Sequence, residues 1–227
     1  MTEFNLRLKA SVDANKFRYG YPWIYSNEII SDRRTKSLLP GSFCKLVDYY
    51  KNPICLVTVN PKSKIFARVM DFNFETTVDA YWLKDKISKA LAKRKEIFRD
   101  PFYRLVNAEA DELPGLIVDR FDKVIVMQPN AFWAENMSEI IANSIKEVCS
   151  IDVVIKNASG RSRRLEGLDD KNLVFFGDLP ETAISVPMNG AIYKADVHEG
   201  QKTGLFYDQR QNHKFVASLA NGKTVLD

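Results

Sequence analysis

The sequence contains few cysteines and histidines. Its 227 residues include three cysteines and two histidines, and none of them have the spacing of a metal-binding motif. The odd number and scattered positions of the cysteines also argue against a disulfide framework. We therefore expect Cys44, Cys55 and Cys149 to be reduced and buried in a cytoplasmic protein.

Long apolar runs are missing as well. No stretch of about 18 apolar residues occurs, so the sequence predicts no membrane-spanning helix. The N-terminus, MTEFNLR, lacks the apolar core and small-residue cleavage site of a signal peptide. With 45% hydrophobic and 27% charged residues, the composition is that of a globular chain, long enough for one large domain or two small ones plus a fragment.

The sequence also lacks a strong net charge. The formal net charge is +4, and the excess lies in residues 1–75, which carry 12 Lys and Arg against 7 Asp and Glu. A basic small domain indicates a polyanionic partner, for which RNA is the obvious candidate. A solvated surface of mixed charge is the alternative interpretation.

Short strands dominate the N-terminal part. Alternation and turn residues predict strands at residues 4–8, 23–25, 42–48, 54–60 and 65–70. A flat sheet this small would expose its edges, so we expect a small barrel or a partly closed sheet. Five basic residues flank the segment Tyr21-Pro22-Trp23 and are candidates for phosphate contacts, whereas Trp23 is expected to be a packing residue: Lys16, Arg18, Arg33, Arg34 and Lys36.

Helices and strands alternate in the central part. A helical period predicts helices at residues 80–99 and 132–149, and β-rich runs predict strands at 116–119, 124–128 and 153–156. This pattern indicates an α+β domain. The basic face of the first helix is either a second RNA-facing surface or an ordinary solvated face.

Two charged clusters stand in the same region. The first is expected to be a structural ion-pair network: Arg104, Glu109, Asp111, Asp119 and Arg120. The second lies in a predicted loop at residues 157–168 and is either a phosphate contact or part of a disordered, merely soluble loop: Arg161, Arg163 and Arg164.

The C-terminal part begins with a hairpin. Asn189-Gly190 is a strong turn signal between the β-rich runs 184–188 and 191–197. A stretch rich in glycine and hydrogen-bonding side chains follows at residues 200–210. Asp208 is then expected to cap a helix over residues 209–220, and residues 223–227 are expected to begin a buried parallel strand.

Three long motifs occur in order: YPWIYSNEI at 21–29, RLVNAEADELPGLIVDRF at 104–121, and GQKTGLFYDQRQNH at 200–213, which is followed by VLD at 225–227. With these motifs the chain resembles the class I S-adenosylmethionine-dependent large-subunit rRNA methyltransferases, in particular the RNA cytosine-C5 branch. Members of that branch carry an N-terminal PUA domain, an RNA-binding pseudo-barrel.

The resemblance implies a fold and a division of the chain. The expected class is α+β: a PUA-like barrel at residues 1–75, a central α+β domain at 76–185, and at 186–227 the hairpin, helix and first strand of an incomplete Rossmann-like methyltransferase domain. In the family, most of that domain lies after the position of Asp227, including the rest of the cofactor loop and the catalytic cysteine.

The resemblance also implies site residues. Nine residues are expected to border the S-adenosylmethionine pocket: Gln201, Lys202, Thr203, Gly204, Phe206, Asp208, Gln209, Arg210 and Asp227. No cysteine of this chain lies where the family has its nucleophile, so we expect no catalysis and no tight binding of the methyl donor by the chain alone. The expected partner is large-subunit rRNA, and a homodimer is left open. The alternative is a non-catalytic RNA-binding module or an inert remnant of a split gene.

Overall fold

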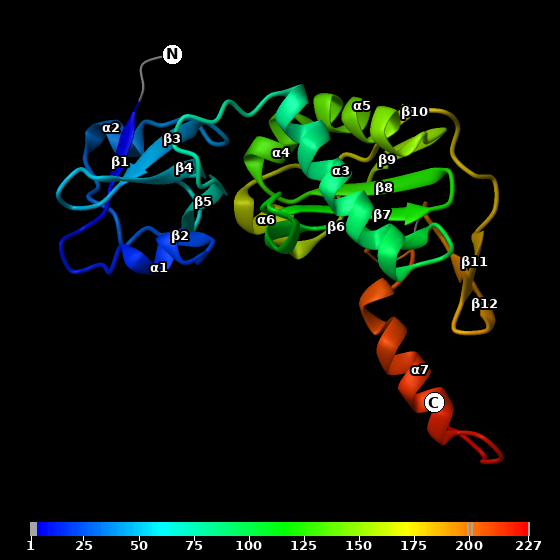
Figure 1. Cartoon of the computed structure of the whole chain (residues 1–227). Helices are drawn as coiled ribbons and strands as arrows, with labels where there is room; N and C mark the ends of the chain where they lie inside the picture. Colours follow the sequence, from blue (N-terminus) through cyan, green and yellow to red (C-terminus); the bar gives the residue numbers. More distant parts are fainter. Residues whose placement is uncertain (1–3, 199, 201, 227) are drawn as a thin grey trace.

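Figure 1 shows the computed structural model, which describes residues 4–198, 200 and 202–226. A small sheet domain at the N-terminus is joined to a larger body of sheet and helices, and the last helix projects from that body. In the described part of the chain, no helix combines the length and the apolar character needed to cross a membrane.

The N-terminal sheet has five strands in the order β1-β3-β4-β5-β2, with β1 and β3 parallel and the other pairs antiparallel. Their bounds match the five expected strands closely: β1 Asn5–Arg7, β2 Trp23–Tyr25, β3 Phe43–Val47, β4 Pro53–Val59 and β5 Ile65–Asp71. An antiparallel bridge between Leu8 and Ile29 connects the two sheet edges and partly closes the sheet. Two short helices lie in the connections between its strands: α1 Asn15–Arg18 and α2 Arg33–Lys36.

The central sheet also has five strands, in the order β10-β9-β8-β7-β6. Their bounds are β6 Phe102–Asn107, β7 Leu116–Phe121, β8 Val124–Pro129, β9 Val153–Lys156 and β10 Leu173–Phe176. Strands β8 and β9 are parallel, because helices α4 (Phe132–Asn136) and α5 (Ser138–Cys149) carry the chain back between them. The expected single helix over 132–149 is thus broken at Met137, and strands β6 and β10 were not predicted.

Alternation along these strands supplies two cores, one on each face of the sheet. On one face, inward side chains such as Val118, Ile125 and Val154 pack beneath α3 (Ala80–Ile97) and α5. On the other face, Phe121 and Val126 pack against the hairpin of β11 (Ile184–Met188) and β12 (Ala191–Ala195). The Asn-Gly hairpin is confirmed, and it is part of a layer that covers the sheet.

The C-terminal segment differs from the prediction in two ways. Tyr207–Gln209 forms a single 3-10 turn before α7 (Arg210–Leu219), and Asp208 provides no side-chain cap because it lies inside this turn, where its carboxylate pairs with Lys202. The expected strand is absent from residues 223–226, which have no neighbouring strand to pair with. The last residue of that expected strand, Asp227, lies outside the described residues.

Candidate cofactor loop and nucleic-acid surfaces

The loop that carries the predicted cofactor residues is held by the central sheet. The Thr203 side chain is fully buried, and its hydroxyl donates to Oδ2 of Asp119 on β7 at 2.5 Å. Asp119 is also fully buried and accepts from Nε of Arg104 at 2.9 Å and from Nη2 at 3.1 Å. The carboxylate thus joins a sheet strand to the loop, with its charge matched by one guanidinium.

Backbone contacts strengthen this attachment. The carbonyl of Lys202 accepts from the side-chain amides of Asn157 at 2.8 Å and Gln128 at 3.2 Å. The Lys202 ammonium pairs with Asp208 at 3.0 Å and lies 4.2 Å from the centre of the Phe206 ring. Lys202 and Asp208 therefore neutralise each other across the loop.

Two positions of this loop have room only for glycine, because the backbone after the hairpin lies against them. Gly204 has φ +108°, and a Cβ at this position would lie 2.5 Å from the carbonyl oxygen of Asp196. A Cβ on Gly200 would clash with the same oxygen. Gly204 therefore allows a close backbone approach, and its partner in the described structure is the end of the hairpin.

The end of the loop is anchored as well. The Tyr207 hydroxyl donates to the Arg120 carbonyl at 2.9 Å, and its ring stacks on Phe121 with centroids 5.2 Å apart. Arg210 donates from Nη2 to the Phe102 carbonyl at 2.6 Å. A cleft of about 330 Å³ lies beside these contacts, between the end of α3, strand β6 and the start of α7.

The predicted cofactor residues are thus only partly brought together. Asp208 and Arg210 both line the cleft, whereas Thr203 and Gly204 contact other parts of the chain. Gln201 and Asp227 lie outside the described residues, and the side-chain oxygen of Gln209 accepts from Asn212. The described residues provide one wall and no enclosed adenosine site, so by themselves they do not fit S-adenosylmethionine.

The basic residues of the barrel fall into two groups. Lys16 pairs with Glu28, and Arg18 pairs with Asp48 at 3.3 Å, so their charges are partly compensated. The other three are exposed on α2 and form no ion pair among the described residues: Arg33, Arg34 and Lys36. A polar hollow of about 500 Å³ lies beside α2, lined in part by Arg7, Arg34 and Lys51.

The predicted arginine loop is a helix. Residues Arg161–Glu166 form α6, and the Arg163 side chain is fully buried inside the fold. Its guanidinium pairs with Glu135 at 2.8 Å and donates to the carbonyls of Pro129 and Asp169. The prediction that Arg163 contacts RNA is therefore wrong, because a buried guanidinium with these partners cannot reach a phosphate. Arg161 and Arg164 are exposed.

The expected ion-pair network is present only in part, and with additional partners, because Arg120 forms no ion pair among the described residues and donates to the carbonyl of Asp122. Arg104 pairs with Asp119 as expected, and Asp111 pairs with Arg94 of α3 at 2.5 Å. Glu109 pairs with Arg68 of the barrel at 3.2 Å. Sequence reasoning missed both new arginines, because their carboxylate partners are separated from them by 17 and 41 positions.

A seam of polar contacts joins the barrel to the central part. The Trp23 indole donates to Glu109 at 2.8 Å, so this tryptophan is a contact residue at the seam. Arg68 also pairs with Glu166 at 2.5 Å, and Asn60 donates to the same carboxylate at 2.7 Å.

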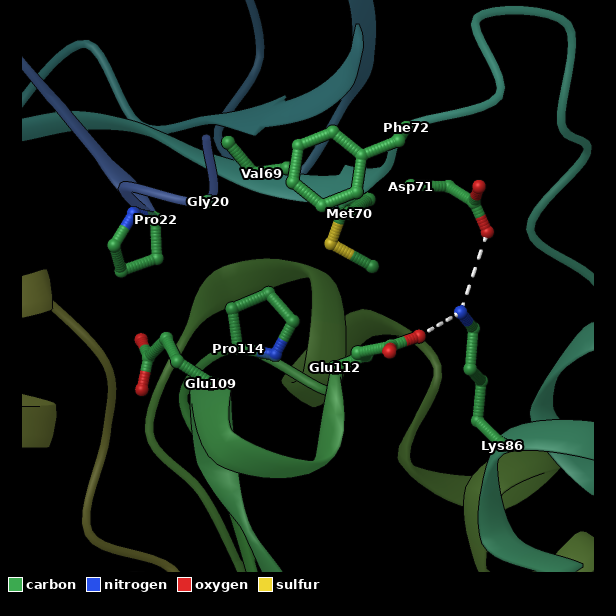
Figure 2. A pocket seen from close by; sticks show the side chains of 10 residues that line it. All are labelled: Gly20, Pro22, Val69, Met70, Asp71, Phe72, Lys86, Glu109, Glu112 and Pro114. Carbon is green, nitrogen blue, oxygen red and sulfur yellow. Dashed lines mark hydrogen bonds and ion pairs between the residues drawn. The ribbon is translucent and has the colours of Figure 1, made fainter. Parts of the chain in front are cut away.

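The seam encloses a small pocket. Figure 2 shows this hollow of about 110 Å³, in which Pro22 and Met70 face Pro114 and Lys86 bridges Asp71 and Glu112. The volume is too small for a nucleotide, so we interpret the pocket as an imperfection of packing between the two parts.

The three thiols are free and buried, and burial raises the pKa of Cys44 and of Cys55 to about 12 and that of Cys149 to about 11. A thiol with so high a pKa is almost entirely protonated near neutral pH and is a poor nucleophile. Within the described residues no group of three or more His, Cys, Asp or Glu side chains could hold a metal ion.

This burial predicts slow thiol chemistry in the folded chain. At pH 8 we expect iodoacetamide to label none of the three cysteines within minutes, and to label all three once guanidinium has unfolded the chain. Intact mass spectrometry of the two samples checks this. Rapid native labelling of any cysteine would show that its thiol is accessible, in conflict with the burial described above.

Comparison with known proteins identifies a domain family and a group of related enzymes. Residues 6–72 match the PUA-like domain family. The chain is 31% identical to the ribosomal RNA large subunit methyltransferase of Deinococcus radiodurans, over 98% of this chain and 56% of that protein. It is also 31% identical to the ribosomal RNA large subunit methyltransferase I of Shewanella frigidimarina, over 91% of this chain and 53% of that protein.

Solved structures share the fold. A proposed SAM-dependent methyltransferase from Streptococcus mutans superposes with a TM-score of 0.79 at 14% identity, over 96% of this chain and 55% of that one. A proposed methyltransferase complexed with SAH gives 0.75 at 15% identity, over 94% and 53%. The chain spans about half the length of these relatives. It is therefore related to the ribosomal RNA large subunit methyltransferases over almost its whole length, with a PUA-like domain at residues 6–72.

Proposed function

We propose that this chain is the RNA-holding part of a large-subunit rRNA methyltransferase that uses S-adenosylmethionine. The observation that carries the proposal is the similarity to the rRNA methyltransferases over 98% of the chain. The exposed basic residues on α2 support it, because they form no ion pair among the described residues and Lys and Arg side chains contact nucleic-acid phosphates. In this proposal the barrel, taken as residues 1–75, contacts RNA, residues 76–185 form the spacer domain, and residues 186–227 start the methyltransferase domain.

In this proposal the cofactor loop forms one side of the S-adenosylmethionine site and is ordered before the ligand binds. Its attachment through Thr203 and Tyr207 fixes Phe206 and Asp208 before any ligand arrives. When bound, S-adenosylmethionine supplies an electrophilic methyl group. The chain's own contribution is to hold one side of the site in place and to neutralise Asp208 with Lys202.

The last helix supports the proposal that further structure completes the site. Helix α7 has no buried residue, and its apolar side chains Phe215, Val216 and Leu219 are 63%, 54% and 63% exposed. An exposed apolar stripe of this kind marks an interaction surface. We propose that it packs against the remainder of an incomplete, Rossmann-like methyltransferase domain, which would be part of the additional length of the relatives.

Cytosine C5 is the proposed target atom. Methylation there requires a thiolate that adds to the ring and a base that later removes the C5 proton. Cys44, Cys55 and Cys149 are buried with raised pKa values, so the thiolate must come from outside the described residues. In this proposal the chain itself contributes RNA contacts. A cytoplasmic location follows separately, because the proposed substrate is rRNA.

The RNA surface can be tested with a matched pair of variants. Replacing Arg33, Arg34 and Lys36 together by alanine is expected to weaken binding of a structured rRNA fragment about tenfold or more. The slope of log affinity against log salt should also decrease in magnitude by about two to three, because each of the three phosphate contacts contributes about 0.7–0.9. Fluorescence anisotropy at several salt concentrations measures both quantities.

The matched control removes three exposed cations from the other candidate surface, which is α3 and the two residues after it: Lys93, Lys95 and Arg99. This variant should weaken RNA binding by much less than the α2 variant does. If it loses affinity while the α2 variant does not, RNA contacts the helix face and the proposed barrel surface is wrong. If neither variant changes the affinity or the salt slope, the RNA-holding role fails.

A further inference from the structure

A second kind of site lies in the cleft next to α7. Its volume of about 330 Å³ falls within the range of small-ligand pockets. Its lining contains Asn107, Asp208 and Ile97 together with three arginines and three aromatic residues: Arg94, Arg104, Arg210, Phe98, Tyr103 and Tyr207. Proteins use this combination to hold unpaired nucleotides.

Most charges in the cleft are already compensated. Arg94 makes two contacts with Asp111, at 2.7 and 2.5 Å, and Arg104 is paired with Asp119. The Asp208 carboxylate is paired with Lys202, outside the lining. These groups shape the cleft and contribute little net charge to it.

Arg210 is the exception among the arginines of the lining. No carboxylate lies within ion-pair distance of it in the described structure, and Asp100 acts on it from farther away. Its Nη2 donates to the Phe102 carbonyl, while its Nε is buried with no acceptor among the described residues. Burial accordingly lowers the pKa of Arg210, because a desolvated cation lacks compensation.

Aromatic rings hold this guanidinium in place. Its Cζ lies 4.7 Å from the centroid of Phe98 and 5.5 Å from that of Tyr207. Stacking of this kind fixes the plane of an arginine while leaving its charge unneutralised. A preordered guanidinium without a counter-ion is well suited to a phosphate group.

We propose that this cleft binds one unpaired nucleotide of RNA, with its phosphate on Arg210. The assignment of the nucleotide to RNA rests on the proposed function, whereas the phosphate site rests on the cleft itself. Asp208 of the cofactor loop lines the cleft, so a nucleotide bound there would lie next to that loop.

The experiment titrates the full chain with uridine 5′-monophosphate, uridine and a short oligouridylate, using calorimetry. We expect the monophosphate to bind at least tenfold more tightly than uridine, and the oligouridylate to displace it. Arg210→Ala should weaken monophosphate binding roughly 10- to 100-fold, as expected for loss of a charged hydrogen bond. Equal affinity for uridine and its monophosphate would overturn the phosphate site, and failure of displacement would overturn the RNA assignment.

Substitutions at Ile97 test the site without touching Arg210. Ile97 lines the cleft, yet 70% of its side chain is exposed, so a charge there should leave the fold intact. Ile97→Glu should weaken monophosphate binding about threefold or more, and Ile97→Lys should strengthen it, because a nearby charge acts on the ligand with opposite signs. A purely structural effect would not reverse with the sign of the charge.

The control places the same charges at Ile140 of α5, which is 42% exposed and outside the cleft lining. Ile140→Glu and Ile140→Lys should bind the monophosphate like the unaltered chain. The α2 triple-alanine variant should also bind the monophosphate normally, even if it no longer binds structured rRNA. The proposed nucleotide site and the proposed RNA surface on α2 can therefore be disproved independently. Unchanged affinity in both Ile97 variants would overturn the proposal.

Discussion

Replacing Arg163 by alanine is expected to destabilise the chain by about 3–5 kcal/mol, the cost of removing one partner from a buried ion pair. Arg163 is fully buried, and its loss would leave the carbonyls of Pro129 and Asp169 without their donors. Among the described residues, Glu135 would keep one ion-pair partner, Lys156, at 2.6 Å. Urea unfolding followed by circular dichroism measures the change.

The neighbouring Arg164 provides the control. It belongs to the same helix but is exposed and makes no ion pair among the described residues. Arg164→Ala should therefore change the free energy of unfolding by no more than about 0.5 kcal/mol. Similar losses in the two variants would mean that the burial of Arg163 contributes nothing specific to stability.

Replacing Asp119 by alanine is the second large expected effect, also about 3–5 kcal/mol. The carboxylate is fully buried between Arg104 and Thr203, so its removal leaves a guanidinium without a counter-ion and a buried hydroxyl without an acceptor. The variant should also release the loop at residues 202–210 from the sheet. Hydrogen exchange of the backbone amides in that loop should become faster in addition to the loss of global stability.

Thr203→Val separates the two consequences. It keeps the shape of the side chain and the Arg104–Asp119 pair but removes the hydroxyl, so it should cost less, about 1.5–3 kcal/mol. The loop should still exchange faster. The double variant should cost less than the sum of the two single changes, because both remove the same hydrogen bond. Strict additivity would show that Thr203 and Asp119 are not coupled.

The sequence predicted the elements that have local signals. The five short strands of the barrel and the Asn-Gly hairpin carry alternation and turn residues that depend on near neighbours only. Strand β6 was missed because a register shift between Arg104 and Val106 interrupts its alternation. Strand β10 was missed because its four residues, Leu173–Phe176, form a short apolar run with no period of its own.

The candidate site depended more on distant contacts. Arg161, Arg163 and Arg164 are equivalent by composition, and only the packing of α6 on Glu135 and Pro129 buries the middle one. The partner of Thr203 is 84 positions away, so no local pattern could identify it. The strand expected at 223–227 is not formed at residues 223–226 for a related reason, since a strand forms only where another strand accepts its hydrogen bonds.

The polar seam between barrel and sheet has a consequence for target choice. Arg68 reaches from the barrel to both Glu109 and Glu166, and Trp23 and Asn60 donate to the same two carboxylates. Contacts at several points oppose both hinge bending and rotation of one part against the other, so the barrel and the central domain are expected to keep a fixed relative orientation. In the proposed function, α2 holds one phosphate stretch at a set distance from the cofactor loop. The nucleotide to be modified would then be chosen by its distance from a bound feature of the rRNA, and the local base sequence would matter less.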